Sequence, residues 1–256
     1  MREKELCKII CQEEIAKDIY SMWLATPKIA NEALAGQFIS LYSNDSSRLL
    51  PRPISICEID KENGQIRVVY RIAGAGTAEF ANLQEGDMIA VIGPLGNGFP
   101  LSVANNKKVV LMGGGIGVPP MLELAKQLTA SKTIICGYRD ETFLMKELSS
   151  VAPLLIATED GSSGVKGNVL DVVEDSNVKA DIIFACGPTP MLRAIKAYAV
   201  KEGIECYIST EEKMACGIGA CLACVCQSKE KDHHTNVNNK RICKDGPVFL
   251  ATEVEL

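Results

Sequence analysis

The sequence lacks several features that mark membrane, secreted and nucleic-acid-binding proteins. No apolar run among its 256 residues reaches the roughly 18 residues of a membrane-spanning helix. The charged start, Met1–Glu5, lacks the apolar stretch of a secretory signal peptide. No basic block is present, and 27 Lys and Arg against 32 Asp and Glu give a net charge of −5. We therefore expect a cytoplasmic protein that binds neither a membrane nor a nucleic acid.

Length and composition fit a globular protein with two domains. At about 150 residues per domain, the chain has room for about 1.7 domains. Hydrophobic residues make up 47% and charged residues 23%, which is ordinary for a folded protein and argues against disorder. Each half is long enough to bury its own core.

The first hundred residues have the pattern of an antiparallel barrel or sandwich. Six runs of β-forming residues alternate with turn-forming residues such as Asn63-Gly64 and Gly86-Asp87. A short helix is predicted at Thr77–Leu83. The six predicted strands are Lys8–Cys11, Tyr20–Ala25, Phe38–Tyr42, Ile54–Ile59, Ile66–Arg71 and Met88–Ile92.

From residue 103 onward, apolar strands alternate with helices, a pattern typical of a parallel sheet with crossover helices. The predicted strands are Val109–Met112, Thr133–Cys136, Leu154–Ala157, Ile182–Ala185 and Cys206–Ser209, and the predicted helices are Met121–Leu128 and Met191–Lys201. We therefore predict three parts: a β-barrel domain over residues 1–102, an α/β domain over 103–210 and a small cysteine-rich segment over 211–256.

Cysteine is abundant and unevenly placed. Five of the 11 cysteines lie within 28 residues, where the chain average gives about one. Four of them have the spacing Cys216-x4-Cys221-x2-Cys224-x18-Cys243, which is that of plant-type [2Fe–2S] ligation. Glycines at 217 and 219 allow the backbone to approach the sulfurs closely. We predict that these four cysteines bind an iron–sulfur cluster.

Two alternatives to a cluster remain open at this point. One is a structural zinc site, although zinc sites usually carry two C-x2-C pairs and this segment has one. The other is a set of unliganded thiols. Cys226 is a fifth candidate ligand, but four thiolates complete a [2Fe–2S] site, so we predict that it does not bind iron. His233 and His234 have the wrong spacing for metal ligands and are interpreted as part of a solvated loop.

Two predicted strands of the α/β half end in glycine-rich turns. Glycines at such ends admit a phosphate to the backbone N–H groups at the start of a helix. The first turn departs from G-x-G-x-x-G, with Val118 in the last position, so a plain tight turn stays the alternative. Two such ends in one parallel sheet favour a dinucleotide site. The candidate nicotinamide-binding residues are Gly113, Gly114, Gly115, Ile116, Gly117, Cys186, Gly187 and Pro188.

The barrel half contains residue types that suit a flavin nucleotide. Arginine pairs with phosphate, a serine hydroxyl can bond a flavin ring nitrogen, and an aromatic ring can stack. Backbone N–H groups before the predicted helix can hold a diphosphate. Each residue alone fits an ordinary strand or surface position better than a binding role, and only their order along the chain favours a flavin. The candidates are Arg52, Pro53, Ile54, Ser55, Val69, Tyr70, Arg71, Gly76 and Thr77.

The order of these motifs resembles the ferredoxin reductase superfamily. In that superfamily an antiparallel flavin-binding barrel precedes a nicotinamide-binding α/β domain. The segment Met214–Cys224, followed by Cys243–Phe249, narrows the resemblance to the electron-transfer subunits of NAD-dependent dihydroorotate dehydrogenases. The resemblance covers essentially the whole chain.

The resemblance implies FAD, a [2Fe–2S] cluster and NAD as electron acceptor. It also implies an FMN-containing partner that oxidises dihydroorotate in pyrimidine biosynthesis, in a heterotetramer with two subunits of each kind. No catalytic residue for dihydroorotate is predicted in this chain. In the resembling family, Thr158–Gly161 lies near the adenosine ribose, where Glu159 and Asp160 would repel a 2′-phosphate and Arg139 would offset part of that repulsion. The alternatives are an NAD(P)H-linked subunit of a hydrogenase or ferredoxin oxidoreductase, and a zinc-stabilised binding module.

Overall fold

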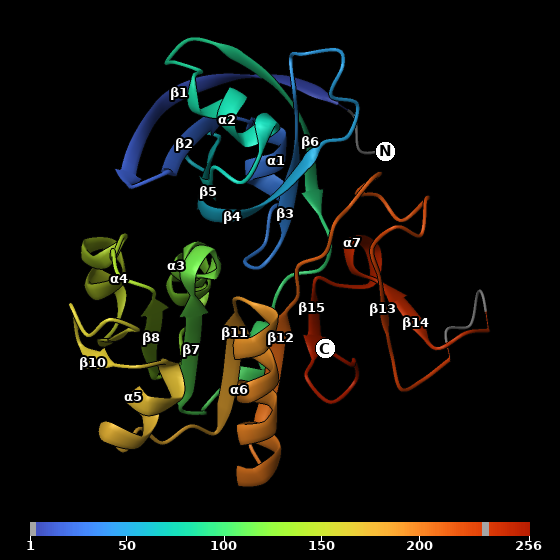
Figure 1. The fold of residues 1–256 in the computed structure, drawn as a ribbon. Coiled ribbons are helices and arrows are strands. Elements are labelled where there is room, and N and C mark those ends of the chain that lie inside the picture. Colours follow the sequence, from blue (N-terminus) through green and yellow to red (C-terminus); the bar gives the residue numbers. More distant parts are fainter. Residues whose placement is uncertain (1–3, 232–235) are drawn as a thin grey trace.

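The computed structural model describes residues 4–231 and 236–256, and its first part is a closed antiparallel barrel (Figure 1). The barrel order is β1–β2–β5–β4–β3–β6. The strands are β1 (Glu5–Ala16), β2 (Ile19–Ala25), β3 (Phe38–Tyr42), β4 (Arg52–Asp60), β5 (Gln65–Arg71) and β6 (Met88–Leu95). Each strand contains one of the six predicted runs, and the predicted barrel architecture is confirmed.

Alternating side chains on β3 divide between the barrel interior and its outer surface. Ile39 and Leu41 belong to the interior apolar cluster. Phe38 belongs instead to a cluster outside the barrel, and Ser40 and Tyr42 lie on that same outer face because side chains two residues apart share one side of a strand. Two short helices, α1 (Pro27–Glu32) and α2 (Ala75–Ala81), also pack on the barrel interior.

The second part is a seven-stranded sheet in the order β10–β9–β8–β7–β11–β12–β15. The strands are β7 (Val109–Gly114), β8 (Lys132–Tyr138), β9 (Leu154–Thr158), β10 (Val165–Lys166), β11 (Ile182–Cys186), β12 (Glu205–Ser209) and β15 (Val248–Leu250). All neighbours are parallel except β15, which runs antiparallel to β12. The predicted parallel sheet is therefore confirmed.

Helices cover both faces of this sheet. α3 (Pro119–Gln127) and α4 (Met145–Val151) pack on the face toward the barrel, and α5 (Val169–Asp175) and α6 (Thr189–Glu202) pack on the other. The sequence predicted α3 and α6 but missed α4 and α5, which have only seven residues each. The α5 start does carry a local signal, because the Asn168 side chain accepts the Leu170 N–H at 2.9 Å as a helix cap.

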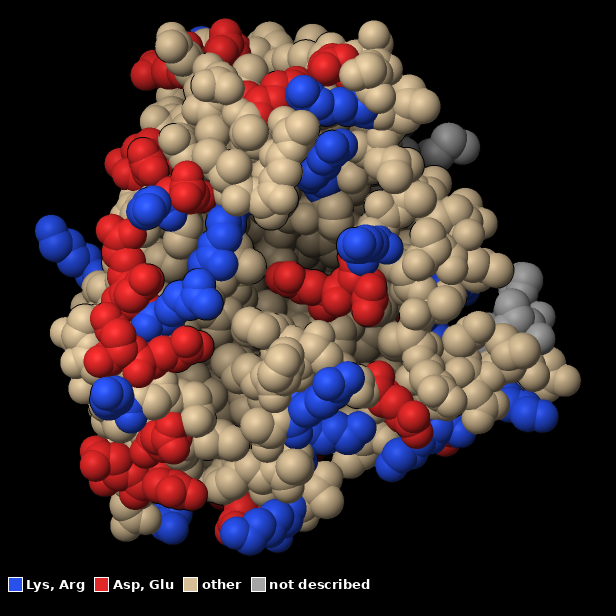
Figure 2. All heavy atoms as spheres, in the orientation of Figure 1, with Lys and Arg blue, Asp and Glu red and all other residues tan. Residues whose placement is uncertain are grey.

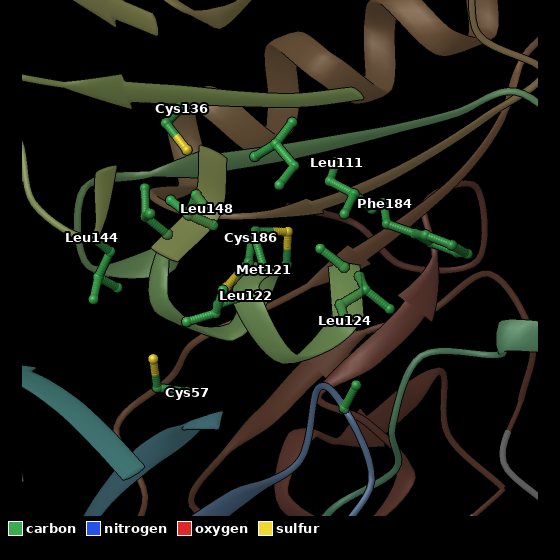
Figure 3. Packing of buried hydrophobic residues seen from close by; sticks show 14 of the residues in the cluster. Cys57, Leu111, Met121, Leu122, Leu124, Cys136, Leu144, Leu148, Phe184 and Cys186 are labelled. Carbon is green, nitrogen blue, oxygen red and sulfur yellow. The ribbon is translucent and has the colours of Figure 1, made fainter. Parts of the chain in front are cut away.

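α3 lies between the sheet and the barrel. Figure 3 shows Met121 and Leu122 of this helix in the same packed region as Cys57 of barrel strand β4. The buried Glu123 carboxylate accepts the Ile59 N–H at 2.8 Å, and Lys126 forms an ion pair with Glu58. Apolar packing and these polar contacts together join the two parts along one helix.

The cysteine-rich segment leaves the sheet and then returns to it. It forms the two-stranded sheet of β13 (Val225–Gln227) and β14 (Asn239–Arg241), then the short helix α7 (Ile242–Asp245), and ends in β15. Since β15 is the edge strand of the seven-stranded sheet, the segment is fixed to the α/β part at both ends. Within the described ranges, no helix has the length and apolarity needed to cross a membrane.

Candidate functional site

The four predicted iron ligands form two close pairs. The Cys216 and Cys221 side chains are within hydrogen-bonding reach of each other. The Cys243 side chain contacts Cys224 in the same way, and the Cys243 N–H donates to the Cys224 Sγ at 3.4 Å. The charge of Cys216 also acts on Cys243, so the two pairs are neighbours.

A zinc ion and a binuclear cluster need different arrangements of four thiolates. A structural zinc site needs four donors around a single ion. A [2Fe–2S] cluster spreads four thiolates over two irons. Two neighbouring thiol pairs therefore fit the cluster better than zinc.

The backbone around Cys216 suits a negatively charged sulfur. Burial raises the pKa of Cys216, but hydrogen bonds from the Ile218 N–H, the Cys221 thiol and the N–H groups of Cys221 and Ala220 outweigh it and lower the pKa to about 6. The Ala220 N–H lies 3.2 Å from the Cys216 Sγ. Gly217 and Gly219 have φ of +68° and +84°, which turn the loop tightly enough to aim these donors. The loop can thus stabilise the charge of a bound cluster.

Cys226 lies near Cys224, whose charge acts on it, but its side chain belongs to neither pair. It is half-buried on β13, opposite Lys240 of β14, and packs against the apolar cluster on the far face of the seven-stranded sheet. Burial raises the pKa of its thiol. This position agrees with a packing role. His233 and His234 lie outside the described residues.

The cysteine-rich segment rests on the outer face of the barrel. A Cβ at Gly217 would lie 2.9 Å from the Ser40 Oγ of β3. Beyond β6, the Asn97 N–H donates to the Gly246 carbonyl at 2.7 Å, and the Asn97 Nδ2 donates to the carbonyl oxygens of Lys244 and Asp245 at 3.1 and 3.0 Å. The sequence analysis missed Ser40 and Asn97, because no spacing rule connects them to the cysteines.

The predicted flavin residues on β4 occupy the strand next to this contact. Pro53 and Ser55 are paired in register with Ser40 and Phe38 of β3, and so share its outer face. Ile54 packs against the barrel interior. A flavin ring over Ser55 would therefore lie one strand away from the cysteine loop.

At the start of β4, Arg52 lies against the first turn of α2. A Cβ at Gly76 would be 2.2 Å from the Arg52 Nε, so the guanidinium occupies the space that glycine leaves open here. The Thr77 hydroxyl accepts the N–H groups of Ala73 and Gly74 at 2.8 and 3.2 Å and so fixes the turn. A cationic side chain beside a turn of this kind is suited to a diphosphate.

Tyr70 does not fit its predicted role as an aromatic that stacks on the flavin. Its side chain is buried in the barrel interior, where it stacks on Tyr20 of β2 at 5.9 Å and contacts Phe80 edge-on. The Tyr70 hydroxyl lies 3.0 Å from the Gln12 Oε1. The neighbours Val69 and Arg71 lie on the outer side, since β5 alternates.

The predicted nicotinamide residues meet at one edge of the sheet. β11 and β7 are parallel neighbours, so Cys186 lies opposite Gly113. The turn after β7 is the short 3-10 helix η2 (Gly115–Gly117), and a Cβ at Gly117 would lie 2.4 Å from the Cys186 carbonyl oxygen. The two glycine-rich strand ends are therefore in direct backbone contact.

This sheet edge faces the barrel. The Arg71 Nη2 from β5 lies 4.0 Å from the Cβ position of Gly115, which brings the predicted flavin and nicotinamide residues together. Figure 2 shows the molecule hollowed between the barrel and the sheet, with acidic and basic side chains around the hollow. A nicotinamide bound at Gly115 could therefore approach a flavin bound on the barrel.

Two further polar residues of this edge were missed from the sequence. Ser209 ends β12 directly beside Cys186, and Glu211 follows two residues later. Burial raises the pKa of Cys186, and the nearby Glu211 carboxylate raises it further. Cys186 therefore stays a neutral thiol at neutral pH. The signal available in the sequence was that Ser209 ends a predicted parallel strand and Glu211 follows it.

Two family models match separate parts of the chain. Residues 6–99 match the oxidoreductase FAD-binding domain. Residues 211–255 match the iron–sulfur cluster binding domain of dihydroorotate dehydrogenase B. The two matches include the barrel candidates for FAD and all four predicted iron ligands.

Known proteins of the same length are similar to this chain throughout. The dihydroorotate dehydrogenase B (NAD+) electron transfer subunit of Fusobacterium nucleatum is 43% identical, covering 98% of both chains. The subunit of the same description from Streptococcus mutans is 42% identical, covering 99% of this chain and 98% of its own. A solved structure of the NADH-dependent reduced ferredoxin-NADP oxidoreductase superposes with a TM-score of 0.87 at 29% identity, covering 98% of this chain and 90% of that one.

Proposed function

Because the chain belongs to the family of dihydroorotate dehydrogenase B (NAD+) electron transfer subunits, we propose that it carries electrons from a dihydroorotate-oxidising partner to NAD+ in pyrimidine biosynthesis. It is an oxidoreductase subunit with an FAD-binding domain and an iron–sulfur domain. The partner contains FMN, and two subunits of each kind form a heterotetramer. The observation that carries this proposal is that the four cysteines form two neighbouring pairs, in a segment that packs on the outer face of the barrel.

Each part of the chain has its own role in this proposal. When bound, a cluster exchanges single electrons, a nicotinamide exchanges two, and a flavin can do either. Residues 211–256 would hold the cluster through Cys216, Cys221, Cys224 and Cys243. Residues 1–102 would hold FAD, with Arg52 and Gly76 at the diphosphate and Ser55 at the ring. Residues 103–210 would hold NAD at the strand ends that meet at Gly117 and Cys186.

The reaction site for dihydroorotate belongs to the partner in this proposal, so this chain supplies no catalytic residue to its oxidation. We also assign the chain to the cytoplasm. All 11 cysteines, every one of them within the described residues, are free thiols, as a reducing compartment requires.

A second candidate function is supported by the solved NADH-dependent ferredoxin-NADP oxidoreductase, which has the same overall fold at 29% identity. The chain would then serve a ferredoxin instead of a dihydroorotate-oxidising subunit. The identity of 43% to the dihydroorotate dehydrogenase B subunit favours the first function.

The function is tested by purifying the chain anaerobically with its own dihydroorotate-oxidising partner. We expect a coloured complex with about two irons and two sulfides per copy of this chain. It should form NADH when dihydroorotate is added. A colourless zinc-containing protein would contradict the proposal, and electron transfer to ferredoxin without any from dihydroorotate would favour the second function.

We expect NADH to be preferred over NADPH. Glu159 and Asp160 follow β9, and hydrogen bonds from Ser162 lower the pKa of Asp160, so that it is ionised at neutral pH. The Asp160 N–H donates to the Arg139 carbonyl at 3.3 Å, so Arg139 is close enough to offset part of the repulsion of a 2′-phosphate. The kcat/KM with a dye acceptor should be about tenfold higher for NADH at low ionic strength.

Salt and a double variant check the electrostatic origin of that preference. Added salt should bring the NADH/NADPH ratio of kcat/KM closer to one, because salt screens exposed charges. The double variant Glu159→Gln/Asp160→Asn should have a lower NADH/NADPH ratio of kcat/KM than the unaltered protein. Asp175→Asn, at the end of α5, should leave that ratio unchanged. Equal kcat/KM values for both nucleotides in the unaltered protein would contradict the prediction.

Spacing and valence favour Cys243 over Cys226 as the fourth ligand, and the close contact of Cys243 with Cys224 supports that choice. Cys243→Ala removes one member of the Cys224 pair, and we expect it to abolish the cluster signal in visible and electron paramagnetic resonance spectra. Cys226→Ala removes a thiol that packs beside Cys224 but is not needed to complete four ligands, and it should leave the spectra unchanged. An intact cluster in Cys243→Ala together with a lost one in Cys226→Ala would mean that the fourth ligand is Cys226.

A further inference from the structure

The outer face of β3 carries a buried hydroxyl group without a hydrogen-bond partner. Ser40 is 1% exposed, and its Oγ is one of two buried side-chain atoms in the described part of the chain that lack a partner. The other is the Thr26 Oγ1. Buried hydroxyl groups in folded proteins are nearly always paired, so an unpaired one points to a group that binds beside it.

Ser40 faces the loop that carries the first cysteine pair. Its Oγ lies 2.9 Å from the Cβ position of Gly217, the residue after Cys216. A side chain at Gly217 would fill this space, and glycine leaves it open toward the hydroxyl.

The other side chains on this face also contact the cysteine segment. Phe38, two residues before Ser40, packs in one apolar cluster with Cys224 and Cys243. Tyr42 lies two residues after Ser40. Burial raises the pKa of Tyr42, and the nearby charge of Cys216 raises it further. Three successive outward positions of β3 therefore line up along both cysteine pairs, with Ser40 in the middle.

The same strand borders the predicted flavin residues. Ser40 is paired in register with Pro53 of β4, and Phe38 with Ser55. The Ser40 hydroxyl thus lies between the strand assigned to the flavin and the loop assigned to the cluster. Cys216, the first proposed ligand, directly precedes Gly217, so a cluster held by the first cysteine pair would present its sulfurs on the side that Ser40 faces.

We propose that the Ser40 hydroxyl donates a hydrogen bond to a sulfur of the iron–sulfur cluster on its Cys216–Cys221 side, and thereby raises the reduction potential of the cluster. This inference rests on the proposed function, because it requires the cluster. Reduction adds negative charge to the cluster, and a donor aimed at sulfur stabilises that charge. Through this bond, β3 sets how readily the cluster gives electrons to the flavin.

The test is a redox titration of the Ser40→Ala holo-complex, with the cluster followed by electron paramagnetic resonance and the flavin by visible absorption. Loss of one hydrogen bond should lower the equilibrium constant for cluster reduction about three- to tenfold, or about 28–59 mV for one electron. The g-values of the reduced cluster should shift as well. The flavin potential should stay unchanged.

Two further variants make each outcome decisive. Thr26→Val removes the other unpaired buried hydroxyl, between β2 and α1, and should leave the cluster potential unchanged. Ser40→Thr keeps the donor and should restore the potential, or the cluster itself if Ser40→Ala fails to load it. The proposal is overturned if Ser40→Ala leaves the reduction potential of the cluster unchanged or shifts only that of the flavin. It is also overturned if Ser40→Thr loses as much of the cluster as Ser40→Ala does. Absence of any cluster in the unaltered complex would refute the proposed function instead.

Discussion

Replacing Cys221 with serine is expected to remove or cripple the iron–sulfur cluster while FAD stays bound. Cys221 is an exposed member of the Cys216 pair, so its loss leaves one iron with a single thiolate. The flavin candidates lie on β4, β5 and α2, which the change does not touch. Electron transfer with the dihydroorotate-oxidising partner should fall at least about 100-fold, and NADH oxidation by an artificial dye should stay near normal.

Cys11→Ser is the matched control for this experiment. Cys11 is the other exposed cysteine of the chain and lies on β1, away from the cysteine-rich segment. Its replacement should leave both activities and the cluster spectrum intact. Normal turnover with the partner in Cys221→Ser would refute the assignment of the cluster to this loop.

Gly117→Ala is expected to disable the nicotinamide site without affecting the other two. Its methyl group would lie 2.4 Å from the carbonyl oxygen of Cys186 and 2.6 Å from the backbone nitrogen of Gly187. Both are backbone atoms, so the two strand ends must move apart. We expect kcat/KM for NADH with a dye acceptor to fall about 10- to 100-fold, because small displacements of a bound reactant are costly.

Gly137→Ala provides the comparison at the same sheet edge. A Cβ at Gly137 would lie 3.0 Å from the Val169 Cγ1, a side-chain atom that can adjust, and at an ordinary contact distance of 3.9 Å from the Gly113 carbonyl oxygen. Gly137→Ala should therefore lower kcat/KM for NADH much less than Gly117→Ala does. FAD absorbance and the cluster signal, recorded on the same Gly117→Ala sample, should be normal. Equal NADH kinetics in Gly117→Ala and the unaltered protein would contradict this place for the nucleotide.

Most strands of both parts could be predicted because their signals are local, but the short strands β10 and β15 were missed. Runs such as Phe38–Tyr42 and Leu154–Ala157 are apolar, short and bounded by turn residues, and both became strands with little change in bounds. The helices α1, α4 and α5 were missed, because six or seven residues are too few to establish a helical period. Their stability comes from packing on the barrel and the sheet.

The role of a single side chain was harder to predict than the strand that carries it. Tyr70 was expected to stack on the flavin, and the strand that carries it formed as predicted. Only the closing of the barrel decided that Tyr70 points inward onto Tyr20 while Arg71 points outward toward Gly115. A shift of one residue in a strand moves a side chain to the opposite face, and the sequence around Tyr70 does not set that choice.

The sequence by itself determined which kinds of group this protein is suited to bind. Four cysteines at ligand spacing, and glycines at the ends of apolar strands, are local features of chain geometry and survive any arrangement of the domains. The tertiary structure decided which groups meet: the cysteine loop against Ser40, Arg71 against Gly115, and β15 against β12. These contacts join residues far apart in the chain and depend on how α3 fixes the sheet to the barrel, which no local pattern specifies.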